Sequence, residues 1–175
     1  MTTIKLEVNW RLESTLTKSL KELRRVVIGL RPPALDELGL THALRQGLED
    51  LKTDGLDCRF SQVGTPFRLP SSMEIAAYRI VQEALTNIRR HANATKVNLR
   101  LQFQEDKLLV EVGDNGKGFD LSETLGRAIS VGHMGLLGMK QRVETLGGDI
   151  KIKTSEGTGT TIILSLPIHP QVEER

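Results

Sequence analysis

Residues 79–92, RIVQEALTNIRRHA, predict the helix around which the rest of the chain is organised. Apolar residues recur along it at the spacing of one helical face, which predicts contact with a hydrophobic core: Ile80, Val81, Ala84, Leu85 and Ile88. Glu83, Asn87 and His91 are four residues apart and line up on an adjoining face. A carboxylate, a carboxamide and an imidazole in that line can hold a hydrated metal ion and phosphate oxygens. Taken alone, the pattern also fits a solvated stripe on an amphipathic helix.

Three glycine-bearing motifs follow this helix in the sequence. Residues 114–119, DNGKGF, come after a strand-like run, and residues 132–139, GHMGLLGM, lead into a helix-like run. Residues 157–160, GTGT, come last. Each motif alone is a weak signal, because an Asn-Gly pair is typical of a hairpin turn and flexible loops also carry spaced glycines. Their order behind the 79–92 helix is what makes them informative.

The composition favours one globular domain with a helical extension. The chain has 175 residues, of which 38% are hydrophobic, enough for a sizeable core. A net charge of +2 shows no basic excess of the kind that nucleic-acid-binding proteins concentrate in patches, so we expect no nucleic-acid partner. The single cysteine, Cys58, excludes an internal disulfide and is expected to be a small buried side chain.

Nothing in the sequence predicts insertion into a membrane. No apolar run approaches the roughly 20 residues that span a bilayer, and the N-terminus lacks a signal-peptide core. We therefore expect a cytoplasmic protein in which this chain makes no membrane contact, although its parent protein can be anchored elsewhere.

The helical extension is predicted over residues 3–30. A heptad seam runs along it: Leu16, Leu20, Leu23, Val27 and Leu30. The seam predicts pairing with a helix of a second chain or with a segment outside this sequence, and packing against the protein's own globular domain is the alternative. Pro32 and Pro33 end the helix, because proline lacks the amide hydrogen and clashes with the preceding turn.

The remaining elements are predicted from periodicity and turn residues. The 79–92 helix is expected to begin near Ser71 or Ser72, one of which would cap it. Residues 113–135 are expected to be mostly irregular, and loops of that length are usually functional or mobile. The other expected elements are helices over 35–52 and 136–146 and strands over 56–63, 97–103, 108–112, 150–152 and 161–166.

The order QEALTN…HA, DNGKGF, GHMGLLGM and GTGT resembles the N, G1, G2 and G3 boxes of the ATP-binding domain of two-component sensor histidine kinases. That domain belongs to the ATPase superfamily of gyrase, Hsp90 and MutL, and the resemblance covers roughly residues 30–167. The preceding LRPPALDELGLTHAL and the short segment between G1 and G2 are most similar to the NarX/DegS/DesK-type subfamily.

The resemblance implies an α+β fold with defined domain limits. The expected architecture is a two-layer α/β sandwich, the Bergerat or GHKL fold, with a mixed, mostly antiparallel sheet and helices on one face. A coiled-coil-type helix would precede it. Residues 1–31 would be the second helix of a dimerisation and phosphoacceptor hairpin, residues 32–169 the ATPase domain and residues 170–175 a polar tail.

The resemblance also implies roles for the residues of the G1 and G3 boxes. Asp114 is expected to accept a hydrogen bond from the exocyclic amine of adenine, with Thr160 nearby on the last strand. Gly116 and Gly118 lack side chains, which lets a ligand approach the backbone closely.

The G2 box resembles the family's triphosphate cradle. Gly132, Gly135 and Gly138 recur up to a helix start, where free amides and the helix dipole bind anions. His133 and Leu136 lie in the same stretch and are counted with the ATP-binding residues. A solvated loop position is the alternative for His133.

Residues of the N box would complete the site. Asn87 resembles the residue that ligates Mg²⁺, an ion that prefers oxygen ligands and keeps several waters. Arg90 and His91 are expected to meet phosphate oxygens. Glu83 matches the glutamate that activates water in hydrolytic relatives, and in a kinase we expect it to orient the metal shell or assist transfer. Glu83 and Asn87 are therefore the candidate catalytic residues.

Taken together, the resemblance implies binding of ATP and Mg²⁺ and transfer of the γ-phosphate to a histidine, for relay to a response regulator. None of the four histidines has the ELHD-like context of an acceptor: His42, His91, His133 and His169. We therefore expect the catalytic part of a longer kinase, paired with a second kinase chain and unable to phosphorylate itself. The alternatives are a stand-alone ATPase or protein-serine kinase of this fold, and a non-catalytic nucleotide-binding module.

Overall fold

The structure, a computed structural model, describes residues 32–122, 124 and 134–168. The helix expected over residues 3–30, the polar tail, Gly132 and His133 lie outside the described residues.

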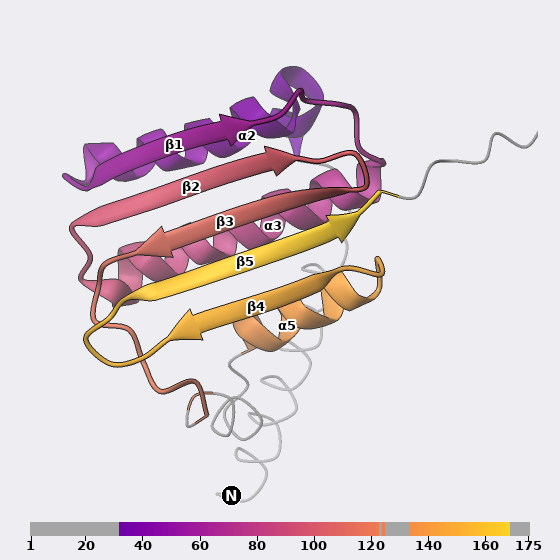
Figure 1. Ribbon diagram of the computed structural model, residues 1–175. Coiled ribbons are helices and arrows are strands. Elements are labelled where there is room, and N and C mark those ends of the chain that lie inside the picture. The colour runs from indigo at the N-terminus through magenta and orange to yellow at the C-terminus, as the bar shows by residue number, and fades with distance from the viewer. Residues whose placement is uncertain (1–31, 123, 125–133, 169–175) are drawn as a thin grey trace, which may run out of the picture.

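A five-stranded sheet with the strand order β1-β2-β3-β5-β4 forms one layer of the protein (Figure 1). Strand β1 (Asp57–Val63) pairs in parallel with β2 (Lys96–Phe103). The other neighbours are antiparallel: β2 with β3 (Lys107–Asp114), β3 with β5 (Thr160–Pro167), and β5 with β4 (Asp149–Thr154). The mixed, mostly antiparallel sheet expected from the sequence is confirmed.

Within the described part of the chain, three helices form the second layer, all on one face of the sheet (Figure 1). They are α2 (Pro33–Thr53), α3 (Ser71–Asn87) and α5 (Met134–Glu144). Helix α3 lies in the chain between β1 and β2 and makes the crossover that their parallel pairing requires. The two-layer α+β sandwich is therefore confirmed.

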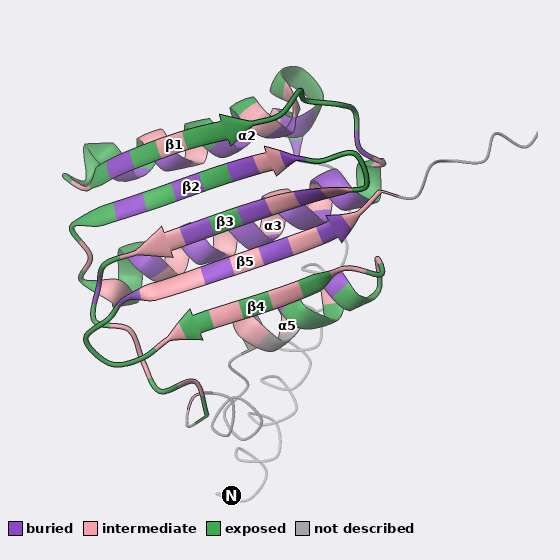
Figure 2. Ribbon diagram, viewed as in Figure 1, coloured by how far each residue is buried: buried purple, intermediate pink, exposed green. Residues whose placement is uncertain are grey.

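The core lies between these two layers and follows the periodicities of the sequence. Along β2, Val97, Leu99 and Leu101 are completely buried, while the residues between them face away from the helices. Figure 2 shows this alternation from the side of the sheet that the helices leave open. Leu44 and Leu48 of α2 are equally buried, so the helix stripe and the strand faces meet in one core.

Cys58 of β1 is buried, as expected, and burial raises the pKa of its thiol. None of the helices that the structure describes is both long enough and apolar enough to cross a bilayer.

The start of α3 differs from the prediction. The helix begins at Ser71, and neither serine caps it, because Pro70 occupies the N-cap position and no side chain bonds to the first turn. The backbone amides of Met73 and Glu74 instead donate to the carbonyl oxygen of Pro70, at 2.9 and 3.1 Å. The predicted serine cap is therefore wrong, since a backbone carbonyl satisfies the amides that a hydroxyl would have served.

Helix α5 also begins earlier than the predicted residue 136. It starts at Met134 and includes both Gly135 and Gly138. The sequence predicts an irregular stretch up to residue 135, whereas the structure places Gly135 in the first turn of a helix.

Candidate functional site

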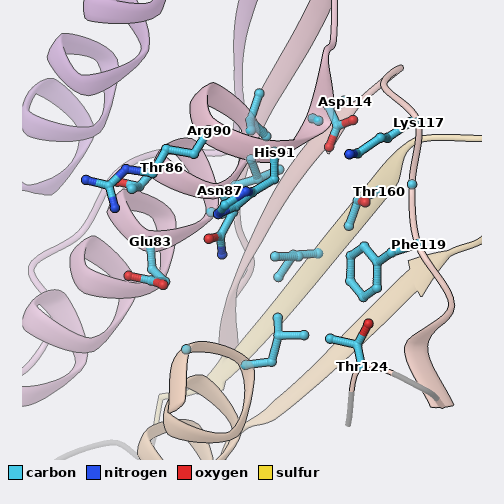
Figure 3. A pocket seen from close by; sticks show the side chains of 18 residues that line it. Glu83, Thr86, Asn87, Arg90, His91, Asp114, Lys117, Phe119, Thr124 and Thr160 are labelled. Atoms are coloured by element: carbon cyan, nitrogen blue, oxygen red, sulfur yellow. The ribbon is translucent and has the colours of Figure 1, made fainter. Parts of the chain in front are cut away.

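A cavity of about 550 Å³ opens between α3, α5 and the sheet (Figure 3). Nine of the predicted site residues line it: Glu83, Asn87, Arg90, His91, Asp114, Gly118, Gly135, Leu136 and Thr160. Gly116 and Gly138 do not line it. Residues from four distant parts of the sequence thus meet at one place, although only tertiary contacts bring them together.

The far end of α3 changes from an α-helix to a π-helix within this site. The π-turn η1 (Ile88–Ala92) follows α3 directly and ends at Asn93, whose φ of 51° is left-handed. Such turns are rare and frequently occur at functional sites. Residues after Ile88 are therefore rotated relative to a continuous α-helix, yet His91 still lines the cavity with Asn87 and Glu83.

The polar side chains at the end of α3 and in η1 point in different directions. Figure 3 shows Asn87 and His91 on the side of the helix that faces Thr160 and Phe119, whereas Arg90 is directed away from Asp114. The structure therefore brings Arg90 to the rim of the cavity without turning it inward.

Apolar side chains make one wall of the cavity. They come from α3, η1 and the inward faces of two neighbouring strands: Ala84, Ile88, Val112 and Ile162. Val112 and Ile162 are direct partners across the β3–β5 pair. The sequence places Ala84 and Ile88 on an apolar helix face and Val112 and Ile162 in expected strands, and nothing in the local pattern distinguishes residues beside a cavity from the others.

Asp114 is held at this apolar end by backbone amides. It is the cross-strand partner of Thr160, and its Oδ1 accepts a hydrogen bond of 2.7 Å from the amide of Gly116. Burial raises the pKa of the Asp114 carboxyl, while the amides of Gly116 and Thr160 act in the opposite direction. The carboxylate keeps further acceptor capacity, so it can read an amine at the edge of a planar ligand.

The glycines of the DNGKGF motif are required by close contacts within the chain. A β-carbon on Gly116 would overlap the carbonyl oxygen of Ala92, and one on Gly118 would overlap that of Ser155. Gly118 also has a φ of 59°, a left-handed conformation that favours glycine. Gly116 is buried against η1, so its missing side chain admits the protein's own backbone.

Asn115 fastens this loop to the start of β2, a role that the local sequence pattern does not indicate. Its Oδ1 accepts hydrogen bonds from the amides of Thr95 and Lys96, at 2.9 and 2.8 Å. Its Nδ2 donates to Thr95 Oγ1 at 2.9 Å. The Asn-Gly pair is therefore a clamp between segments 20 residues apart and not a hairpin turn.

Thr154 joins the same loop to the β4–β5 hairpin. Its Oγ1 accepts a hydrogen bond from the amide of Phe119 at 3.2 Å and donates to the carbonyl oxygen of Gly159 at 3.1 Å. It also lies 3.1 Å from the hydroxyl of Thr160. The ring of Phe119 lies in the cavity opposite α3 (Figure 3), so this network holds an aromatic wall in place.

The opposite end of the cavity is polar. Glu83 lies against Gly135 of α5, and Asn87 follows one helical turn later. The described residues include no group of three or more His, Cys, Asp or Glu arranged to hold a metal ion. The oxygens of Asn87 and Glu83 suit Mg²⁺, and an ion bound there would take its other ligands from water or from a ligand's phosphates.

Gly138 is a predicted site residue that no described contact explains, because none of the residues that the structure describes lies within 4 Å of a β-carbon added to it. Lys117, Thr86 and Thr124 line the cavity without having been predicted. Lys117 lies in the DNGKGF motif beside Asp114 (Figure 3), so the motif itself was the signal that pointed to it.

Comparisons with known proteins agree with this geometry. Residues 73–170 match the family described as histidine kinase-, DNA gyrase B-, and HSP90-like ATPase. The chain is 42% identical over 158 residues to the signal transduction histidine-protein kinase/phosphatase DegS of Brevibacillus brevis, an alignment that covers 90% of this chain and 40% of the relative. It is 34% identical over 142 residues to DegS of Bacillus subtilis (strain 168), with 79% and 36% covered.

Solved structures share the fold. The histidine kinase domain of the blue-light activated histidine kinase from Erythrobacter litoralis EL346 superposes with a TM-score of 0.60 at 23% identity, over 73% of this chain and 60% of that chain. The chain spans less than half the length of the two curated relatives. The family match covers more than half of this chain and includes every cavity residue, since these run from Glu83 to Ile162. The chain belongs to the family of histidine kinase-, DNA gyrase B- and HSP90-like ATPases.

Proposed function

We propose that the cavity binds MgATP and that the chain is the catalytic domain of a sensor histidine kinase, which presents the γ-phosphate to a histidine. The observation that carries the proposal is that the cavity has one apolar end and one polar end. A single carboxylate, Asp114, stands at the apolar end, and a carboxylate and a carboxamide, Glu83 and Asn87, stand at the polar end.

The apolar end suits adenine. Val112, Ile162 and Ile88 offer flat apolar contact, and Asp114 accepts a hydrogen bond from the exocyclic amine. Guanine presents a carbonyl oxygen at that position, which a carboxylate repels. The proposal therefore predicts a preference for ATP over GTP.

The polar end suits a triphosphate with its metal ion. We assign Asn87 as the Mg²⁺ ligand and Glu83 as the residue that orients the metal shell or assists transfer. Mg²⁺, when bound there, would neutralise phosphate charge. Arg90 and His91 lie at the rim, where Arg90 would have to turn inward to meet a phosphate. The amides of the G2 box at Gly132, His133, Gly135 and Leu136 complete the proposed cradle, whereas Gly138 lies one turn into α5 and does not line the cavity.

For the whole protein we propose the arrangement of a two-component kinase. Residues 1–31 would pair with a second kinase chain, residues 32–169 would form the ATPase domain, and 170–175 a tail. The phosphoryl group would pass from a histidine to a response regulator in the cytoplasm. The names of the DegS relatives support this reading, because they describe histidine-protein kinase/phosphatases.

Two measurements test the proposal. Calorimetric titration should detect MgATP binding and a much weaker response to GTP, and absence of ATP binding would contradict it. Incubation with γ-labelled ATP and a separate dimerisation hairpin carrying its acceptor histidine should label the hairpin with acid-labile, base-stable phosphate. The transfer would be slow, because the high effective concentration of a tethered partner is lost. Acid-stable label on this chain alone would favour the serine-kinase alternative, and ATP binding without any transfer would favour a binding module.

A further inference from the structure

Arg89 lies inside the π-turn η1, directly before Arg90 and His91 of the candidate site. Its guanidinium turns toward the C-terminal end of α2. The Nε atom lies 2.7 Å from Asp54 Oδ2, and a terminal nitrogen donates to the carbonyl oxygen of Asp50 at 3.3 Å. Arg89 therefore ties one side of the π-turn to a different helix.

The π-turn is otherwise supported at its two ends, where Ile88 belongs to the core and Ala92 packs against it. Only Ile88 of its five residues is buried, and Arg89, Arg90 and His91 are exposed. At its far end the carbonyl oxygen of Ala92 accepts a hydrogen bond of 2.8 Å from the amide of Lys117. The turn is thus held at one end by the DNGKGF loop and along its middle by Arg89.

We propose that Arg89 is a positioning residue for phosphate binding. By tying η1 to α2 it sets the direction in which His91 leaves the turn toward the cavity, without touching the nucleotide itself. The inference rests on the proposed MgATP site. A backbone rotation at Arg89 carries its two neighbours with it, because the three residues are consecutive in one turn.

Because the ion pair is exposed, its effect on ligand binding can be measured separately from its effect on folding. The side chains of Arg89 and Asp54 are 50% and 43% exposed, and ion pairs at such exposure contribute little to global stability. Variants of either residue should therefore fold, and any effect on the ligand should be confined to the phosphate end.

The test compares MgATP with adenosine, which lacks the phosphates. The variants are Arg89→Gln, Asp54→Asn, the double variant, and the exchanged pair Arg89→Asp with Asp54→Arg. Arg59→Gln is the matched control, because it removes the same charge from an exposed arginine on β1. A terminal nitrogen of Arg59 lies 3.9 Å from Asp57 Oδ2, and Arg59 does not line the cavity. Affinity is measured by calorimetry for MgATP and by competition for adenosine.

Arg89→Gln and Asp54→Asn should each weaken MgATP binding about 3- to 10-fold and change adenosine binding less than about 2-fold. The double variant should be no worse than the poorer single variant, because both remove one contact. The exchanged pair should recover part of the loss, and Arg59→Gln should stay within about 2-fold of the unaltered protein.

Three results would overturn the inference: unchanged MgATP affinity in Arg89→Gln, equal losses for MgATP and adenosine, or a loss in Arg59→Gln as large as that in Arg89→Gln. Failure of the proposed function would look different. In that case the unaltered protein would not bind MgATP, and neither Arg90→Gln nor His91→Ala would change its binding.

Discussion

The carboxylate of Glu83 lies against Gly135, so closely that a β-carbon on Gly135 would stand 2.8 Å from Glu83 Oε1. Helix α3 therefore presents its acidic residue to the first turn of α5 with no space for a side chain between them. The contact joins the N box to the G2 box, and the missing side chain sets the position of the carboxylate at the polar end of the cavity.

Gly135→Ala should displace Glu83 while leaving the protein folded, because the far end of a glutamate side chain is flexible. We expect phosphotransfer to a supplied hairpin to slow about 10- to 100-fold, since small misplacements of an active-site group have effects of that size. Gly138→Ala is the control. No described residue lies within 4 Å of the added carbon, so this variant should instead stabilise α5 by about 0.5–1 kcal/mol in urea unfolding. Equal transfer rates in both variants would show that the Glu83–Gly135 contact has no part in catalysis.

Asn87→Ala should remove the magnesium-dependent part of ATP binding. We expect a loss of at least about 1.4 kcal/mol, or tenfold, in the presence of Mg²⁺ and little change with a chelator. Titrations under the two conditions measure it. Thr86→Ala is a neighbouring control, because its hydroxyl already donates to the carbonyl oxygen of Gln82 at 2.8 Å. If the loss is the same with and without the metal, Asn87 contacts the nucleotide directly or is structural.

Asp114→Asn should weaken ATP binding by about 1–3 kcal/mol, because the amide nitrogen offers a donor where the adenine amine needs an acceptor. Calorimetry with ATP and GTP checks this, and the ratio of the two affinities should move toward one. An unchanged ATP affinity would remove Asp114 from the site.

Asp114→Asn should make the folded protein more stable, although it weakens ATP binding. Burial raises the pKa of Asp114 in the folded protein, so the folded state binds its proton more tightly than the unfolded state does. The unaltered protein therefore loses stability as the pH rises through the interval between the two pKa values. The carboxamide of the Asp114→Asn variant does not titrate, so the stability advantage of this variant should grow from acid pH to neutrality. Urea unfolding across that range measures the difference, and an advantage that shrinks with rising pH would contradict it.

Asn115→Ala should loosen the DNGKGF loop. It removes the three hydrogen bonds to Thr95 and Lys96, and we expect a loss of about 1–2 kcal/mol in unfolding free energy because the group is exposed. Asn115→Asp keeps the two acceptor bonds and should lose less. Hydrogen exchange of the Lys117 amide, which bonds to Ala92, should become faster in the alanine variant. Identical exchange in all three proteins would mean that the clamp does not hold the loop.

Local sequence was enough to predict the elements whose residues interact with near neighbours. The period-two alternation from Val97 to Phe103 predicted β2, and the apolar stripe from Ile80 to Ile88 predicted the buried face of α3. The order of the boxes was enough to predict the fold class. The sequence predicted the first residues of the helices less well. The carbonyl of Pro70 takes the place of the expected serine cap of α3, and α5 begins at Met134.

The site depended on contacts between residues far apart in the chain. Sequence spacing identified Asp114 and Asn87 as candidates, but only the β3–β5 register made Val112 and Ile162 a wall beside them. In the same way, Gly116 is glycine because the carbonyl of Ala92 approaches it, and Asn115 is a clamp because Thr95 lies opposite. Such contacts produce no periodic pattern in the sequence, because close packing depends on which segments the tertiary structure brings together.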